Sequence, residues 1–419
     1  FVTDATAFSN DMFSQSPFLE YANYFNVYAI KVPSNESGAD HPGTATDVSE
    51  PLIPVKYVDT YFNATYDAYG FHRLLYYELD GNSANNTEGI INIVLANNFP
   101  IYDLALIIVN SSEYGGTGGE FPISYNGTYG SEIAIHEMGH SLFDLKDEYY
   151  PGDLLAAEAV NMTQETDPTL VKWKNWLNTN NVGIFPYATS GNAASWNRPH
   201  QNCKMRYLDV PFCSVCKEGM VEKLHTIITP IEDYTPNNIT IDNPVFPIDF
   251  QLNLIKTIPN TLESTWSLNT TNVASNVDDL SILESDLVEG INTVTAVVHD
   301  NTPLLKVDNH ETLHIYTVTW TINYTVETGI EEIDDEVNTL SITVFPNPSE
   351  SIMFFKLESQ QDVILIVDII SMDGKKVNTI EISNLENYPL NISSLSQGIY
   401  IANFYNNNTL IARKKIVKQ

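Results

Sequence analysis

The sequence predicts an α/β or α+β domain over residues 1–228, followed by two β-sandwich domains. In the first part, strand-like runs at Gly89 to Ala96 and Asp103 to Ser111 alternate with helical stretches at 131–146 and 170–178. From about residue 229 the helical period disappears, and alternating polar and apolar residues, as in "HIYTVTWTINYTV" from residue 314, are typical of strands. We therefore expect an immunoglobulin-like β-sandwich at 229–327, an acidic linker at 328–338 and a second β-sandwich at 339–419.

Length and charge limit the class of protein. A chain of 419 residues with 43% hydrophobic residues exceeds the size at which single cores stop growing, so two or three domains are expected. It carries 20 Lys and Arg against 53 Asp and Glu, a formal net charge of -33, which repels phosphate backbones and excludes nucleic acid as a partner. The longest apolar run, Leu104 to Val109, is far shorter than the roughly 20 residues of a spanning helix, so no transmembrane segment is expected.

Residues 339–419 contain four landmarks in a fixed order. These are "VFPNPS" from Val344, "MDGKKV" from Met372, "LSQGIYIANF" from Leu395 and the terminal "ARKKIVKQ". The order resembles the C-terminal sorting domain of the type IX secretion system, which moves proteins across a bacterial outer membrane. The resemblance implies a secreted or cell-surface protein that engages the secretion machinery. The alternative is that Pro-Asn-Pro and Asp-Gly are simply the turns of a small β-sandwich.

The stretch "GSEIAIHEMGHSLFDLKDEYY", from Gly130 to Tyr150, contains a candidate zinc site. On a helix, residues four apart lie on one face, so His136 and His140 can direct two imidazole nitrogens at one ion. Glu137 is rotated about 100° from His136, which lets its carboxylate reach a zinc-bound water and act as general base. The pattern predicts one catalytic Zn²⁺, with Glu137 as a catalytic residue.

The third ligand is less obvious from the spacing. In metzincin metallopeptidases a glycine three residues after the second histidine ends the helix, and a His or Asp ligand follows three residues later. Here Phe143 and Lys146 hold those positions, and neither fits. We predict that the exit turn is one residue longer and that Asp147 is the third ligand. The alternatives are as follows: Glu148, Asp144 and Glu158.

The candidate zinc segment and a later cysteine-containing segment together resemble a known family. "HEMGHSLFDLKDEY", followed by "NCKMRYLDVPFCSVC" at Asn202 to Cys216, is similar to the bacterial IgA peptidase family of zinc endopeptidases. The resemblance covers roughly residues 1–228 and implies a metzincin-like zinc peptidase domain of the His-Glu-x-x-His type. It implies endopeptidase activity without defining the substrate.

A methionine and a tyrosine in the second segment have counterparts in metzincins. Those enzymes place a methionine turn beneath the zinc, and several follow it two residues later with a tyrosine that stabilises the oxyanion. "CKMRY" supplies Met205 and Tyr207 at that spacing, so Tyr207 is the predicted oxyanion donor and Tyr149 its competitor. The alternative for Tyr207 is an ordinary core tyrosine.

Cys203, Cys213 and Cys216 lie close together in the sequence, with His200 just before them. The spacing is close to that of a structural zinc site and resembles archaeal metzincins with a second zinc, but that requires four ligands and a reducing environment. Export favours one disulfide from Cys203 to Cys213 or Cys216. The glycine-rich stretch at 111–121 either receives an extended peptide as an added strand or is a loop without substrate contacts.

These features predict a secreted zinc-dependent endopeptidase that hydrolyses peptide bonds of extracellular host proteins, with immunoglobulin A as one candidate. One alternative is a metallopeptidase directed at mucin-like glycoproteins. Another is a cell-surface adhesion or glycan-binding protein with a vestigial zinc site. The intact Glu137 favours an enzyme, because a vestigial site is free to lose its general base.

Overall fold

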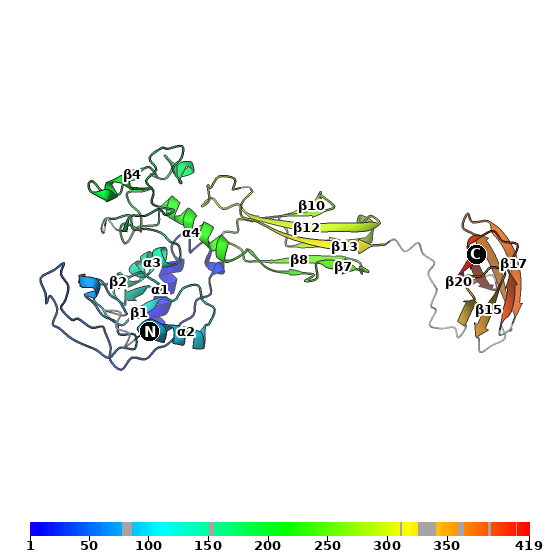
Figure 1. Cartoon of the computed structure of the whole chain (residues 1–419), viewed down its shortest axis with the longest axis horizontal. Helices are drawn as coiled ribbons and strands as arrows, with labels where there is room; N and C mark the ends of the chain where they lie inside the picture. The colour runs from blue at the N-terminus through cyan, green and yellow to red at the C-terminus, as the bar shows by residue number, and fades with distance from the viewer. Residues whose placement is uncertain are drawn as a thin grey trace. The chain divides into compact units, whose positions relative to one another are not determined.

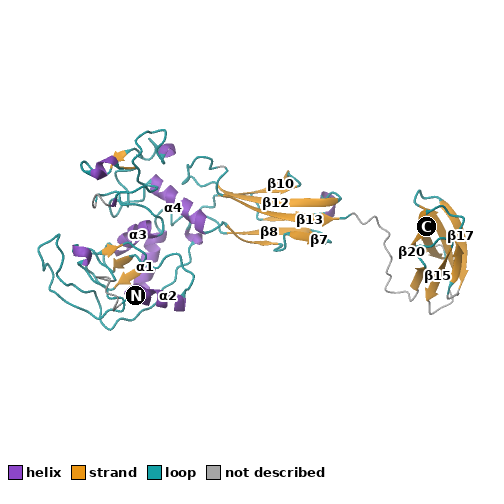
Figure 2. Ribbon diagram, in the orientation of Figure 1, coloured by secondary structure: helices purple, strands orange, loops and turns teal. Residues whose placement is uncertain are grey.

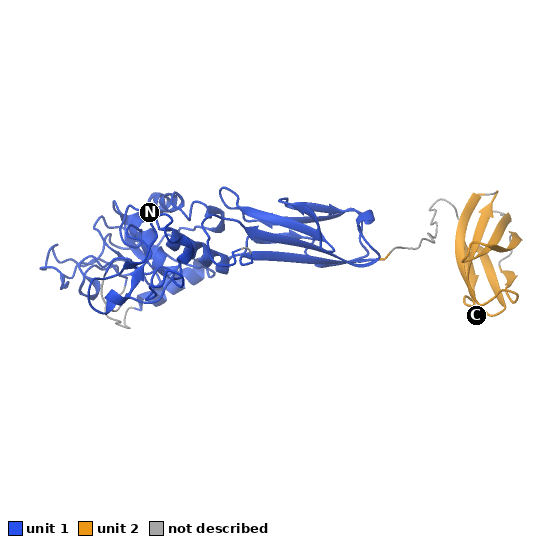
Figure 3. Ribbon diagram, turned by 90° about the horizontal axis from the view of Figure 1, so that it is seen from above, with its two compact units in different colours: residues 1–324 blue, residues 325–419 orange. Residues whose placement is uncertain are grey.

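The computed structural model describes residues 1–77, 86–150, 155–310, 312–325, 341–358, 364–383, 387–407 and 409–419. The chain forms two compact units, residues 1–324 and 325–419 (Figure 3). The acidic linker expected at 328–338 lies outside the described residues. Among the described helices, none is long and apolar enough to cross a membrane.

The N-terminal part of the first unit combines helices with small sheets (Figures 1 and 2). Its α-helices are α1 (Val2–Phe13), α2 (Thr87–Asn98), α3 (Gly130–Ser141) and α4 (Ser214–Ile227). One sheet has the order β1-β3-β2, with β1 (Ile107–Val109) parallel to β3 (Ile123–Tyr125) and β2 (Gly116–Thr117) antiparallel to it. A second, two-stranded sheet pairs β4 (Phe185–Pro186) with β5 (Asn197–Arg198).

Short 3₁₀ helices occur in the first unit at Ala22–Tyr24, Ala68–Gly70, Lys174–Trp176, Asn192–Ser195 and Glu284–Asp286.

Helix α3 lies between two hydrophobic clusters. Ile135 and Met138 belong to a cluster that also contains buried side chains of α1 and α4. Ile133, on another side of the same helix, packs in a cluster with α2 and the β1-β3-β2 sheet. Because α3 is covered on several sides, its histidines are held by a rigid element whose position the core determines.

Residues 89–96, predicted as a strand, form most of helix α2 instead. Asn86 caps this helix, since its side chain accepts a hydrogen bond of 3.0 Å from the Gly89 N–H. Ile91 and Leu95 are buried four residues apart, while Ile93 between them is exposed. The helical spacing of the buried pair and the cap therefore outweigh the strand propensity of the β-branched residues.

Two predicted helices are shorter than expected. Helix α3 ends at Ser141, within the 131–146 stretch. In the 170–178 stretch the structure has only a 3₁₀ helix, followed by Asn178 with a φ of 62°. Trp173 and Trp176 in this stretch are buried, and Trp173 Nε1 donates a hydrogen bond of 2.8 Å to the Gly183 carbonyl. Tertiary burial of the two tryptophans, rather than helical periodicity, determines this segment.

The rest of the first unit consists mainly of strands. A five-stranded sheet has the order β10-β9-β12-β13-β7 and a three-stranded sheet the order β11-β8-β6. Their bounds are β6 Ile231–Thr235, β7 Thr240–Asp242, β8 Ile248–Leu254, β9 Leu262–Leu268, β10 Thr271–Ser275, β11 Asp279–Ile282, β12 Gly290–Asp300 and β13 Ile315–Tyr324. Both sheets contribute to one core, in which Trp266 and Trp320 stack with their ring centroids 5.9 Å apart. The immunoglobulin-like class of this segment and the boundary at 229 remain predictions.

A buried carboxylate joins these strands to the helical part. Asp300, at the end of β12, accepts hydrogen bonds from Tyr21 (2.6 Å), His225 of α4 (3.1 Å) and Thr261 (2.6 Å). Burial opposes ionisation, yet these three donors hold the pKa of Asp300 below its usual value. The contacts explain why residues 1–324 form one compact unit.

The second unit contains two further sheets with one shared core. Their strand orders are β14-β15-β18 and β17-β16-β19-β20. The bounds are β14 Ser341–Phe345, β15 Ile352–Glu358, β16 Ile364–Ser371, β17 Lys376–Ser383, β18 Tyr388–Asn391, β19 Gly398–Asn406 and β20 Thr409–Lys418. Gly374, in the predicted Asp-Gly turn between β16 and β17, has a φ of 81°, which favours glycine.

Candidate functional site

Helix α3 presents both histidines with their Nε2 atoms toward one point. His136 Nδ1 donates a hydrogen bond of 2.9 Å to the Lys204 carbonyl, and His140 Nδ1 donates one of 2.7 Å to the Leu145 carbonyl. A carbonyl can only accept, so each Nδ1 carries a proton. The two backbone carbonyls therefore orient the rings and leave Nε2 to face a ligand.

The chain leaves α3 through a turn at Asp144. Asp144 has a φ of 57°, in the left-handed region in which glycine is common. Phe143, one position earlier, is where metzincins have the glycine that ends the helix. The N–H of Leu145 donates a hydrogen bond of 2.9 Å back to the Gly139 carbonyl, which closes the turn. This geometry agrees with an exit turn that is one residue longer than in metzincins.

Asp147 lies against both histidines after this turn. Its Oδ1 is 3.1 Å from Nε2 of His136 and 3.1 Å from Nε2 of His140. Burial works against charge, but the hydrogen bonds to the histidines lower the pKa of Asp147 to about 2. Burial likewise opposes protonation of His140, yet its bond to Asp147 raises the pKa of that imidazole to about 9.

The alternative third ligands lie elsewhere. Asp144 points outward, with its side chain 74% exposed and paired with Lys223 at 2.8 Å. Glu158 is also at the surface, where it pairs with Lys172. Glu148 is completely buried, with a carboxylate oxygen 3.2 Å from Sγ of Cys216. Of the four candidates, Asp147 is the one whose described contacts reach both histidines.

Glu137 lies beside the histidines and under the backbone of the glycine-rich stretch. A Cβ atom added to Gly118 would lie 2.9 Å from Glu137 Oε2 and 3.5 Å from His140 Cβ. The Gly118 N–H acts on the Glu137 carboxylate in favour of its charged form. Burial raises the pKa of Glu137, while the two histidines and this N–H act in the opposite direction. Gly118 follows strand β2, so an outer strand of the β1-β3-β2 sheet lies next to the candidate base.

Met205 packs directly beneath α3, as its predicted role requires. It is fully buried, and a Cβ atom on Gly139 would lie 2.8 Å from its Sδ atom. Glycine at 139, between the two histidines, therefore allows the methionine to approach the helix backbone.

A buried ion pair anchors the segment that carries Met205. Lys204, which is 1% exposed, pairs with Glu132 of α3. Glu132 also accepts hydrogen bonds from the Asp209 N–H at 2.9 Å and from Gln15 at 2.8 Å. These contacts fix the position of the Lys204 carbonyl, which accepts the hydrogen bond from His136 Nδ1. Sequence reasoning did not identify this lysine, which only the tertiary contact reveals.

The two tyrosines considered as oxyanion donors occupy different surroundings. Tyr207 and Tyr149 are exposed to a similar extent, 47% and 43%, but the Tyr207 ring lies 4.8 Å from the guanidinium carbon of Arg206. The Tyr149 ring stacks near His136, with 6.4 Å between the ring centroids. Burial raises the pKa of the Tyr149 hydroxyl, and the nearby carboxylates of Asp147 and Glu137 raise it further. The hydroxyl that shares the environment of the histidines is thus that of Tyr149.

The three cysteines, all within the described residues, are free, so the expected disulfide is not formed. They are buried together with Glu148, and their ligand atoms and one carboxylate oxygen lie within 4.8 Å of one another. His200, the predicted fourth member, instead accepts a hydrogen bond of 3.0 Å from the Asn202 N–H. Glu148 was considered only as a ligand of the histidine site, because the sequence does not show which way its side chain turns.

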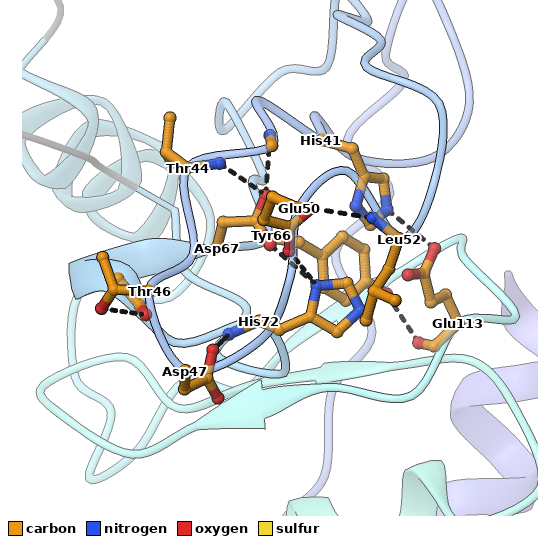
Figure 4. Close-up of polar contacts among 12 residues, drawn as sticks. His41, Thr44, Thr46, Asp47, Glu50, Leu52, Tyr66, Asp67, His72 and Glu113 are labelled. Atoms are coloured by element: carbon orange, nitrogen blue, oxygen red, sulfur yellow. Dashed lines mark hydrogen bonds and ion pairs between the residues drawn. The ribbon is translucent and has the colours of Figure 1, made fainter.

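A third polar cluster holds together the irregular segment before α2 (Figure 4). His72 Nδ1 lies 3.0 Å from both Glu50 Oε1 and Asp67 Oδ1. The other oxygens of these carboxylates accept backbone N–H groups, from Leu52 at 3.0 Å and from Gly43 at 2.8 Å. These bonds satisfy the carboxylates internally and give the cluster a structural role.

Two parts of the chain match known protein families. Residues 1–189 match the family model described as IgA Peptidase M64, and residues 343–419 match the Secretion system C-terminal sorting domain. Both resemblances predicted from the sequence are thereby confirmed, although the segment with Met205 and the cysteines lies beyond the peptidase match. The sorting domain indicates export across the bacterial outer membrane. No curated protein matches the chain.

Comparison with solved structures gives only remote similarities. Latent PorU from Porphyromonas gingivalis is 14% identical, over 44% of this chain and 19% of its own, with a TM-score of 0.16. The β-glucuronidase of Parabacteroides merdae is 7% identical, over 54% of this chain and 28% of its own, with a TM-score of 0.17. The fibronectin(III)-like modules of Clostridium thermocellum CbhA are 10% identical, over 45% of this chain and 94% of their own, with a TM-score of 0.16. The chain spans less than a third of the length of the first two.

Proposed function

We propose that this chain is a secreted zinc-dependent endopeptidase that hydrolyses peptide bonds of extracellular host proteins. The observation that supports this most directly is the meeting of His136, His140 and Asp147 at one point, with Glu137 beside them. The class of enzyme is a metzincin-like peptidase of the His-Glu-x-x-His type, because Met205 lies under the histidine helix at Gly139.

The three side chains fit a zinc ion in their spacing and donor type. Ligand atoms about 2.05 Å from a tetrahedral zinc lie about 3.3 Å from one another. The two Nε2 to Oδ1 distances of 3.1 Å are close to that value. The backbone carbonyls that accept the Nδ1 protons leave each Nε2 lone pair free for a metal. His136, His140 and Asp147 would therefore hold one Zn²⁺.

The remaining residues have roles in moving protons and binding charge. Zinc, when bound, lowers the pKa of a water and polarises a carbonyl. The Glu137 carboxylate takes the proton of the attacking water and returns it to the leaving amine, which is general base and then general acid catalysis. The Gly118 N–H favours the charged form of this carboxylate. The Tyr149 hydroxyl, or the Tyr207 hydroxyl as the sequence predicts, donates to the carbonyl oxygen as charge develops on it.

The backbone that follows β2 is the surface for an extended substrate. In β2 itself Gly116 is bridged by Leu74, whereas a Cβ atom added to Gly119 would meet open space. A peptide that pairs with the backbone at 117–119 would pass next to Glu137 and His140, where its scissile bond is needed. Main-chain pairing of this kind favours an unfolded or extended stretch of a protein over a compact domain.

Immunoglobulin A is the substrate that the family name suggests, and mucin-like glycoproteins are the alternative. The test is unbiased cleavage-site profiling of the full chain against a proteome-derived peptide library, with Glu137→Ala as the matched control. Intact immunoglobulin A and a mucin are then compared as protein substrates. We expect new peptide termini with the wild-type chain and none with Glu137→Ala. Identical profiles with both chains would overturn the proposal and favour an adhesion or glycan-binding protein with a vestigial site.

A further inference from the structure

A second group of metal-ligand side chains lies behind the histidine site. Glu148, Cys203 and Cys216 are 0% exposed and Cys213 is 6% exposed. One ligand atom of each lies within 4.8 Å of the others. We call this group the cysteine cluster.

The distances within the cysteine cluster are those of the edges of a coordination tetrahedron. With zinc–sulfur bonds of about 2.3 Å, two sulfur ligands lie about 3.8 Å apart, and a sulfur and an oxygen about 3.6 Å apart. The Sγ atoms of Cys203 and Cys216 are 3.6 Å apart. Glu148 Oε1 lies 3.2 Å from Sγ of Cys216 and 4.0 Å from Sγ of Cys213. A disulfide needs about 2.05 Å between sulfurs, so this spacing fits a central cation better than a bond.

Glu148 gives a second, independent indication of a ligand. Its carboxylate is completely buried, and Oε2 has no hydrogen-bond partner. The other oxygen accepts a hydrogen bond of 3.2 Å from Asn161. A buried carboxylate with an unpaired oxygen is strongly unfavourable unless a cation or another donor meets it.

Backbone groups that favour negative charge lie close to the cysteine sulfurs. The Cys213 N–H donates a hydrogen bond to Sγ of Cys203 at 3.2 Å. Cys213 is the N-cap of α4 and Cys216 lies in its first turn, where the helix dipole stabilises negative charge. Thiolate ligands select soft or borderline cations, of which zinc suits a closed tetrahedral site.

We propose that Glu148, Cys203, Cys213 and Cys216 bind a second, structural zinc ion, separate from the site on α3. Glu148, rather than His200, supplies the fourth ligand. The set is closed, with four protein ligands and no exposed position for a water, as in structural zinc sites.

This ion would stabilise the positions of two proposed ligands of the histidine site, Asp147 and His136. Glu148 follows Asp147 directly in the chain, and its N–H donates a hydrogen bond of 2.6 Å to the Met205 carbonyl. Cys203 precedes Lys204, whose carbonyl orients His136. The zinc therefore ties the segment after α3 to the methionine segment and to α4, and it fixes both Asp147 and the partner of His136.

The experiment is metal analysis of the full chain with His136→Ala and His140→Ala together, which removes the site on α3 and leaves the cysteine cluster untouched. Wild-type chain is expected to contain two zinc ions and the double variant one. X-ray absorption of that remaining zinc should show three sulfur neighbours at about 2.3 Å. A double variant without zinc, or with zinc bound only by nitrogen and oxygen, would overturn the proposal. None of these readouts depends on peptidase activity.

Two further variants identify the ligands in the same background. Glu148→Gln keeps the side-chain volume and should lower zinc retention at least tenfold, while Glu158→Gln, at an exposed acid, should leave it unchanged. Retention equal to that of Glu158→Gln would remove Glu148 from the set. Wild-type chain recovered after export should yield three alkylatable thiols after denaturation with a chelator. One thiol in that measurement would show a disulfide and overturn the site.

Discussion

The histidine site and the cysteine cluster meet at two consecutive residues, Asp147 and Glu148, whose side chains turn to opposite sides. The Asp147 side chain is 17% exposed and that of His140 22% exposed. Glu148 and Cys216 are 0% exposed. The two proposed metal sites therefore differ in their exposure to water. A catalytic metal needs an open coordination position, whereas a structural metal needs none. On the two proposals made above, one turn of chain would serve chemistry through Asp147 and stability through Glu148.

The largest expected effect is that of Glu137→Ala, which tests whether the open site performs hydrolysis. Loss of a general base lowers turnover by roughly 10²- to 10⁴-fold. Zinc content should be unchanged, because neither proposed set of metal ligands includes this carboxylate. Peptide cleavage rates and metal analysis of the same sample check both parts. Near-normal hydrolysis by the variant would show that another group is the base.

Asp147→Asn and Glu148→Gln should affect different metal ions, so the two variants together test whether the histidine site and the cysteine cluster are separate. Asp147→Asn should lower zinc affinity of the histidine site by more than the roughly 10- to 100-fold expected for an outer-shell partner. Glu148→Gln should remove zinc chiefly from the cysteine cluster. Stepwise chelator titration with metal analysis distinguishes them. Loss of the same ion from both variants would mean that the two carboxylates share one site.

Tyr149→Phe tests which hydroxyl serves the open site. Removal of one oxyanion donor lowers kcat on the order of 10²-fold, with little change in KM, because the interaction forms chiefly in the transition state. Tyr207→Phe is the matched variant, since it removes the same atom from a neighbouring surface position. Geometry predicts the larger loss for Tyr149. A larger loss for Tyr207 would support the methionine-turn analogy from the sequence.

Gly118→Ala introduces a methyl group between β2 and the candidate base. That carbon would lie 2.9 Å from Glu137 Oε2, which is closer than carbon and oxygen normally approach, so the carboxylate must shift. We expect a fall in kcat on the order of 10-fold, as misplacement of a reacting group predicts. Both zinc ions should remain bound. Unchanged kcat would mean that Glu137 is not held by this backbone.

Removal of the second unit should have the smallest effect on either site. A chain that ends near Asn338 retains all proposed ligands, since the histidine site and the cysteine cluster draw their residues from the first unit. Zinc content and peptide hydrolysis in vitro should be unchanged. The truncated chain should stay in the periplasm of its native host. Normal secretion would show that export does not require the sorting domain.

Local patterns in the sequence predicted the parts of the site that depend on one helix. The spacing of His136, Glu137 and His140 was sufficient to place three side chains on α3, since helical geometry relates residues four apart wherever the helix lies. The prediction that Asp147 follows a lengthened turn agrees with the left-handed Asp144, which takes the role usual for glycine. In contrast, the strand predicted at 89–96 was wrong, because Ile91 and Leu95 are buried at helical spacing.

The sequence by itself predicted the peptidase family, the helix that carries the two histidines, the sorting domain and the existence of separate β-rich segments. Only the tertiary structure decided that Glu148 joins the cysteines and that the Lys204 carbonyl orients His136. It also places the Tyr149 ring near His136, with 6.4 Å between the ring centroids. Residues His136 and Lys204, like Glu148 and Cys216, are 68 positions apart in the chain. No local period relates positions so distant, because their contact depends on how whole segments pack into one core.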